Sequence, residues 1–296
     1  MATEKIPLGY IELDNGTKAI TAMYDLFLNY MFENPEFWET LRDMVNIIYK
    51  RYIQVNPETK VAPIVGAIIV ETQYKYLVRI DNTTKDQDIK MTAEKELTYI
   101  EFQNRAKTNP PVETRSVEYF GLGIGRSKGK SSNQIWLMAE DLDAVLHGKI
   151  FARYVLKDEQ TGEPHPGDSG ILYVSLPKLA EEKSPAGELA AFLLGKIKTP
   201  ENEKVKEISC KFNMGFDAFK MDKEAVKMLS LRERAMNEGE IIGEERGIAK
   251  GKAEGKAEGK AEGTINAAEQ FLELLNQGLT PEEAYQKIIG TVKLPA

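Results

Sequence analysis

The sequence predicts an α/β protein with a helical C-terminal tail, and three patterns favour that class. Residues 22–53 repeat apolar side chains at steps of three and four, as on the buried face of a helix. Residues 87–104 instead alternate apolar and polar side chains on both sides of a short break, which is typical of two strands joined by a turn. Residues 239–263 carry glycine at every fourth position. We therefore expect a domain at 1–236, a helical repeat or linker at 237–263 and a C-terminal helical hairpin at 264–296.

The remaining elements follow from shorter patterns. Pro57 and Pro63 end the first helix, and residues 61–70 fit either a buried strand or a small helix. A helix is expected to open near residue 113 and to be cut short by its glycines, and Ser184 with Pro185 predicts the start of another. The other expected strands are 74–80, 135–139, 150–157 and 171–176, and the other expected helices are 185–197, 201–212 and 224–236.

Composition restricts the function classes. The chain of 296 residues has one cysteine, so no intramolecular disulfide framework is possible, and this fits a reducing compartment. We find neither a signal peptide nor an apolar run that could span a membrane, so a cytoplasmic protein with no membrane partner is expected. The net charge of −7 argues against a broadly basic DNA-binding surface. Any contact with DNA must use a local patch or a bound cation.

The alternation around residues 94–95 selects one pairing of the two strands. If the chain turns there, opposed residues have numbers that sum to 189, so Ile89 faces Ile100 and Asp88 faces Glu101. A slip of one residue would mix the two faces of the hairpin. The apolar face then carries Ile89, Met91, Ile100 and Phe102, and the polar face carries Asp88, Lys90, Tyr99, Glu101 and Gln103.

The opposed carboxylates of Asp88 and Glu101 need compensation, because like charges facing each other across two strands are destabilising. Mg²⁺ or Mn²⁺ between them would supply it, with the main-chain carbonyl of Phe102 as an extra ligand. Such an ion can activate water for attack on a phosphodiester, and Gln103 is placed to position that water. The alternative is a solvated hairpin face on which Lys90 pairs with a carboxylate.

Other segments agree in order with the motif Asp88-Ile89, eleven residues, then Glu101-Phe102-Gln103. They are Tyr24-Asp25-Leu26-Phe27 ahead of Met31-Phe32, Arg115-Ser-Val-Glu-Tyr119, residues 150–157, residues 171–178 and the glycine-stepped tail. Together they resemble the PD-(D/E)XK nucleases, in the variant seen in the recombination-promoting nuclease and putative transposase family. The resemblance spans most of the chain.

The resemblance implies a restriction-endonuclease-like core, a mixed sheet flanked by helices, and Mg²⁺-dependent DNA cleavage that promotes recombination or transposition. It makes Asp88 and Glu101 metal ligands and puts Gln103 in place of the usual lysine. Leu28 and Ser175 depart from the pattern, because a lysine and an acidic residue are usual there. We hypothesise that Lys90 supplies the missing cation. The alternative function is an inactive or weakly active nuclease fold that serves as an oligomeric DNA-binding or regulatory module.

Two further signals bear on the site. Asp81 is a rival for the first carboxylate, but it would lie beyond the hairpin in this register. The segment at 125–131 has three residues between its glycines where a phosphate-binding loop needs four, so we interpret it as a basic loop. Residues 101–131 carry six Lys/Arg against three Asp/Glu. The predicted DNA contacts are Arg105, Arg115, Arg126, Lys128 and Lys130, and a solvated face is the alternative.

The glycine repeat predicts self-association. Each four-residue step advances about 400° around a helix, so the glycines form a slowly winding groove between Lys and Glu ridges. A second copy could enter that groove and place its Glu ridge on the Lys ridge, which would make the protein a homo-oligomer. A flexible linker is the alternative.

Overall fold

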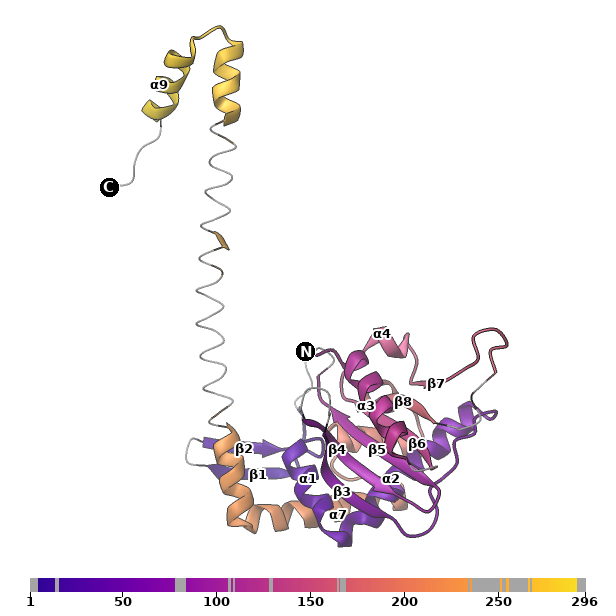
Figure 1. The fold of residues 1–296 in the computed structure, drawn as a ribbon. Helices are drawn as coiled ribbons and strands as arrows, with labels where there is room; N and C mark the ends of the chain where they lie inside the picture. Colours follow the sequence, from indigo (N-terminus) through magenta and orange to yellow (C-terminus); the bar gives the residue numbers. More distant parts are fainter. Residues whose placement is uncertain are drawn as a thin grey trace. The chain divides into compact units, whose positions relative to one another are not determined.

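The computed structural model describes two units of the chain, 1–230 and 231–296 (Figure 1). The described residues are 5–13, 16–77, 84–105, 108, 110–127, 130–163, 165, 169–233, 235, 251, 254–255, 266 and 268–291. The first unit contains a mixed sheet with helices on both faces, and the described residues of the second unit are helical except for a turn at 277–280. The α/β class with a helical C-terminal part is therefore confirmed.

A six-stranded sheet organises the first unit, in the order β3-β4-β5-β6-β8-β7. Strand β5 runs parallel to β6, and β6 runs parallel to β8, whereas the other neighbours are antiparallel. The carboxyl ends of β5, β6 and β8 therefore meet at one end of the sheet. The strands are β3 (Ile69–Leu77), β4 (Thr84–Thr92), β5 (Glu96–Gln103), β6 (Ser131–Met138), β7 (Phe151–Val155) and β8 (Gly170–Ser175).

Helices cover the two faces of this sheet unequally. The large core contains α1 (Asp25–Glu33), α2 (Trp38–Val55), α6 (Pro185–Leu193) and α7 (Glu203–Met221). The opposite face packs against α3 (Val112–Arg126) and α4 (Asp143–Leu146). Short helices at η1 (Pro35–Phe37) and α5 (Leu176–Leu179) also belong to this unit, and residues 223–230 at its end are helical.

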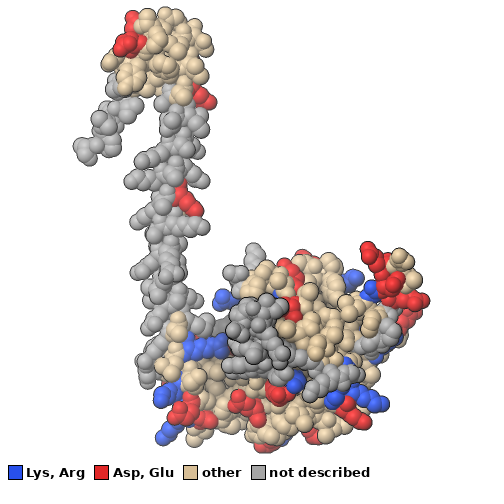
Figure 2. Space-filling model, viewed as in Figure 1, with Lys and Arg blue, Asp and Glu red and all other residues tan. Residues whose placement is uncertain are grey.

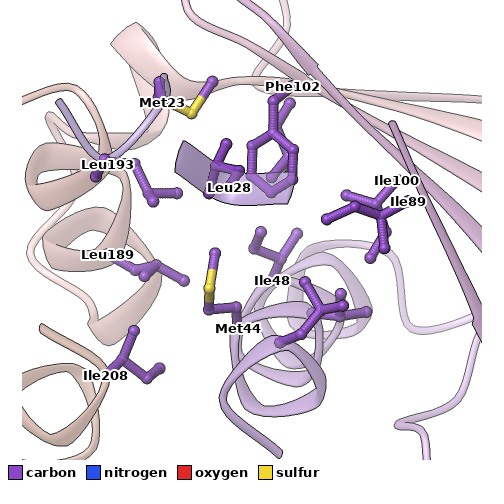
Figure 3. Close-up of a cluster of buried hydrophobic side chains, with 14 of the residues drawn as sticks. Met23, Leu28, Met44, Ile48, Ile89, Ile100, Phe102, Leu189, Leu193 and Ile208 are labelled. Carbon is purple, nitrogen blue, oxygen red and sulfur yellow. The ribbon is translucent and has the colours of Figure 1, made fainter. Parts of the chain in front are cut away.

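The apolar face of the predicted hairpin forms the centre of the large core. Ile89 and Ile100 lie together in the buried cluster that also contains Ile48, Leu28 and Phe102 (Figure 3). Ile89, Met91, Ile100 and Phe102 are all buried, as the alternation predicts. The opposite face is also covered, since Tyr99 is 0% exposed and Glu101 is 5% exposed. The solvated face considered above is therefore wrong for these two residues.

Several expected helices have different limits in the structure, including α6 and α7, and two of the differences have a clear cause. The helix expected at 22–53 is interrupted at Asn34, whose side-chain oxygen accepts a hydrogen bond from the Glu36 backbone N–H at 3.0 Å and caps the η1 turn. The expectation that glycines cut α3 short is wrong, because α3 continues to Arg126. Gly123 lets α3 approach the sheet, since a Cβ there would lie 2.9 Å from Ser132 Oγ.

The N-terminal hairpin has no counterpart among the sequence predictions. Strands β1 (Gly9–Leu13) and β2 (Gly16–Ile20) form a separate two-stranded sheet. A Cβ at Gly9 would lie 2.3 Å from the Phe216 ring, so this hairpin is seated tightly against α7. Its strands have five residues each, which is too short for alternation alone to identify them.

The second unit confirms one predicted feature of the tail. Thr280 N–H donates to Glu283 Oε2 at 2.9 Å and the Glu283 N–H donates back to Thr280 Oγ1 at 3.4 Å, which is the expected capping box before α9 (Pro281–Thr291). Gly251, Glu254 and Gly255 are helical, and most of the glycine repeat lies outside the described residues. Among the described helices, none has the length and apolar character that a membrane crossing requires.

Candidate metal centre

The candidate site lies where the β4–β5 ladder ends. The ladder pairs Ile89 with Ile100 and Lys90 with Tyr99, which confirms the predicted register. Beyond the Ile89–Ile100 pair, hydrogen bonds to side chains replace the backbone–backbone bonds of the ladder. The Asp88 backbone N–H donates to Glu101 Oε1 at 3.2 Å, and the Phe102 backbone N–H donates to Asp88 Oδ2 at 2.9 Å. These reciprocal bonds bring the two carboxylates together at the carboxyl end of β5.

Burial sets the electrostatics of this pair. It raises the pKa of the Glu101 carboxyl well above its usual value, and the neighbouring charge of Asp88 raises it further. The Asp88 N–H and the Arg115 guanidinium act in the opposite direction on the same pKa. A buried carboxyl beside a second carboxylate favours either a bound proton or a bound cation.

The donor set fits Mg²⁺ or Mn²⁺. Both ions prefer carboxylate and carbonyl oxygens, and Asp88 and Glu101 supply two such groups at one place. The described part of the chain contains no group of three or more His, Cys, Asp or Glu side chains placed to hold a metal. An ion here would complete its coordination with water and the main-chain oxygen predicted at Phe102. Asp81, the rival first carboxylate, lies outside the described residues.

Gln103 is held in place by two arginines. Its side-chain nitrogen donates to the Arg105 main-chain carbonyl, and its side-chain oxygen accepts a hydrogen bond from Arg115 Nη2. Both ends of the amide are therefore engaged. Gln103 follows Glu101 by two residues on β5, so the same arrangement fixes Arg115 next to the carboxylate pair.

Arg115 and Tyr119 lie on successive turns of α3, and both face the two carboxylates. The Arg115 guanidinium lies over the Trp136 ring, with Cζ 5.4 Å from its centroid, and the Tyr119 ring stacks on Trp136 at 6.2 Å. Burial raises the pKa of Tyr119, and the charge of Glu101 is the second cause, so that this pKa is about 12. Tyr119 therefore remains a neutral hydroxyl at physiological pH.

Lys90 has a different neighbour from the predicted one. Its Nζ lies 2.6 Å from Glu71 Oε2. Glu71 is on β3, which flanks β4 on the side away from β5. This ion pair explains why the lysine stays on the polar face. Its role beside a scissile phosphate remains a prediction, and in this structure Arg115 is the cation whose charge acts on Glu101.

The predicted basic loop lies at the other end of the strands. Lys130 Nζ donates to the Ala93 carbonyl at 2.7 Å, which joins the loop to the hairpin turn. Because β5 runs from that turn to Glu101, the separation is about 17 Å at 3.3 Å per residue. The Arg126 side chain and Lys128 lie outside the described residues. Lys130 therefore supports the turn, and Arg105 and Arg115 are the predicted DNA contacts that lie near the carboxylates.

A second polar cluster lies at the same end of the sheet, and the sequence reasoning missed it. Asp141 follows β6 and contacts both the Ser175 hydroxyl and Lys178 Nζ, the latter at 3.3 Å. Ser175 in turn caps α5 through the Lys178 N–H at 3.2 Å. A carboxylate therefore lies beside Ser175 even though position 175 itself is not acidic. No local pattern links Asp141 to Ser175, because only the β6–β8 register brings them together.

Comparison of the chain with protein-family models, curated proteins and solved structures found no match to any of them.

Proposed function

We propose that the protein is a Mg²⁺- or Mn²⁺-dependent DNA endonuclease with a restriction-endonuclease-like core, and that its cuts promote recombination or transposition. The single observation that carries the proposal is the reciprocal bonding of Asp88 and Glu101 at the carboxyl end of β5, with Glu101 buried. Polar groups at that end of parallel strands commonly form ligand sites in α/β proteins.

The residues divide the chemistry among them. Asp88 and Glu101 hold the cation, which when bound activates water and neutralises charge on the phosphodiester. Arg115 places a permanent positive charge beside them for the non-bridging phosphate oxygens. Gln103 fixes the direction of that guanidinium.

DNA association must rely on these local groups. On the face seen in Figure 2, acidic and basic side chains of the first unit are interspersed. The net charge of −7 also gives no long-range attraction to a polyanion. A cation held by Asp88 and Glu101 would therefore add to the attraction for the phosphate, and the proposed oligomer would add contacts through its second copy.

Cleavage of supercoiled plasmid tests the proposal. The parent protein should convert it to nicked or linear DNA with Mg²⁺ or Mn²⁺ and not with EDTA, and Asp88→Ala and Glu101→Ala should abolish the conversion. Cleavage that persists in both variants would overturn the assignment of the site. A parent protein that binds DNA without cutting it would instead favour the oligomeric binding or regulatory module.

A further inference from the structure

Trp136 occupies the position on β6 that pairs directly with Glu101 on β5. Its side chain is 0% exposed and lies on the face of the sheet that α3 covers. The indole Nε1–H donates to Gln134 Oε1 at 3.1 Å, which fixes the rotation of the ring. A large rigid ring is therefore held beside the candidate metal centre.

Three side chains pack against this ring. Arg115 lies over it, Tyr119 stacks on it with an interplanar angle of 24°, and Tyr173 packs against it with ring centroids 6.2 Å apart. Arg115 and Tyr119 are one helical turn apart on α3, so a single ring fixes both. The ring thereby determines how the guanidinium is presented to the carboxylates.

The guanidinium has hydrogen-bonding capacity that the protein does not use. Arg115 Nη2 donates to Gln103, whereas Arg115 Nε is buried and makes no hydrogen bond within the described part of the chain. An arginine stacked on an aromatic ring keeps its N–H groups in the plane of the guanidinium, where they match the oxygens of a phosphate. Tyr119 stacks on the same ring one helical turn further along α3, so its hydroxyl adds a donor from the same helix.

We propose that Trp136 is the positioning residue of an oxyanion subsite, in which Arg115 and Tyr119 together receive one phosphate group beside the carboxylate pair. The inference rests on the proposed function for the nature of the ligand, a DNA phosphodiester. Binding of the anion itself needs no metal, so the subsite can be measured separately from cleavage.

Trp136 fluorescence measures the subsite directly. The chain has two tryptophans, and Trp38 donates to the Phe32 carbonyl at the end of α1. A Trp38→Phe protein therefore leaves Trp136 as the single reporter. Titration with inorganic phosphate in EDTA should change its emission saturably, and Arg115→Gln in the same background should remove the change. Emission that does not respond to phosphate would overturn the subsite.

Conservative variants separate positioning from stability. Calorimetric titration with phosphate should give Trp136→Phe an affinity near that of the parent, because a π face remains under the guanidinium. Trp136→Leu should bind about tenfold more weakly, since it has no such face. Urea unfolding supplies the stability of each variant. Equal phosphate affinities in the two variants, or affinities that follow stability alone, would overturn the positioning role, and if Trp136→Leu does not fold the fluorescence titration decides.

The two proposals fail in different ways. Phosphate binding without plasmid cleavage by the metal-loaded protein would refute the endonuclease and leave the subsite intact. Metal-dependent cleavage without phosphate-induced change at Trp136 would refute the subsite and leave the endonuclease intact.

Discussion

Glu96 and Glu101 lie on the same strand and differ in what surrounds their carboxylates. Glu96 Oε1 accepts hydrogen bonds from Thr98 Oγ1 at 2.8 Å, Asn133 Nδ2 at 3.1 Å and the Tyr49 hydroxyl at 3.3 Å. Glu101 receives one backbone N–H and faces a second carboxylate, Asp88. Hydrogen-bond donors of the protein therefore stabilise the carboxylate of Glu96, whereas the neighbouring charge of Asp88 destabilises the ionised form of Glu101. The first supports the fold, and the second is suited to bind a cation.

The largest expected effect separates these two glutamates in activity. Glu101→Gln and Asp88→Asn should each lower the rate of plasmid cleavage by at least about a thousandfold, because each removes a ligand of the cation that activates water. Glu96→Gln is the matched control on the same strand and should cut at the parental rate. A Glu96→Gln protein as inactive as Glu101→Gln would show that the two glutamates do not differ in role.

Removal of the positive charge of Arg115, which lies beside Glu101, should cause a smaller loss of activity. Arg115→Ala should reduce cleavage about a hundredfold, since it removes charge that stabilises the phosphate in the transition state, and it should leave Mn²⁺ affinity measurable. Val117→Ala is the control from the same helix, because its side chain is 65% exposed. Equal cleavage rates for these two proteins would exclude Arg115 from the chemistry.

Lys90 and Glu71 test the remaining lysine prediction. If Lys90 acts at the phosphate, Lys90→Ala should slow cleavage about tenfold, as loss of one partly screened charge does, whereas Glu71→Ala should not. The two proteins share the loss of the 2.6 Å ion pair. Indistinguishable rates would mean that Lys90 does not act at the phosphate.

The smallest effect is on stability without metal. The pKa of Glu101 is higher in the folded than in the unfolded chain, so the folded state binds more protons. This contribution is fully present below the unfolded pKa and is lost as the pH rises through the folded pKa. The free energy of unfolding of the parent should therefore fall over that range.

Glu101→Gln should abolish most of this pH dependence, because it removes the buried charge that faces Asp88, Arg115 and Tyr119. At pH 8 in EDTA the variant should be more stable by about 0.5–2 kcal/mol, the gain that commonly accompanies loss of a strained functional group. Urea unfolding at several pH values measures this. A variant that loses stability with rising pH as the parent does would contradict the electrostatic account.

The sequence was sufficient for the hairpin and insufficient for what covers it. Alternation from Asp88 to Gln103 determines the register, because a slip of one residue would move Ile89 and Ile100 to the polar face of the hairpin. The burial of Glu101 depends on α3, which covers this face of the sheet. Gly123 lets that helix approach Tyr99 and Ser132, and Trp136 lies opposite Glu101 on β6, the strand that pairs with β5 in parallel. Parallel pairing joins segments far apart in sequence, so no local pattern reveals it. The Glu96 donors from Tyr49 and Asn133 come from such distant segments too.

Calorimetric titration with Mn²⁺ tests the central claim most directly, that the carboxylates of Asp88 and Glu101 hold a divalent cation. The parent and Glu96→Gln proteins should bind Mn²⁺ at one site and release protons on binding at low pH, since Glu101 must ionise. Asp88→Asn and Glu101→Gln should each lose that site. Mn²⁺ binding that survives both substitutions, or a parent protein that binds no Mn²⁺, would contradict the account.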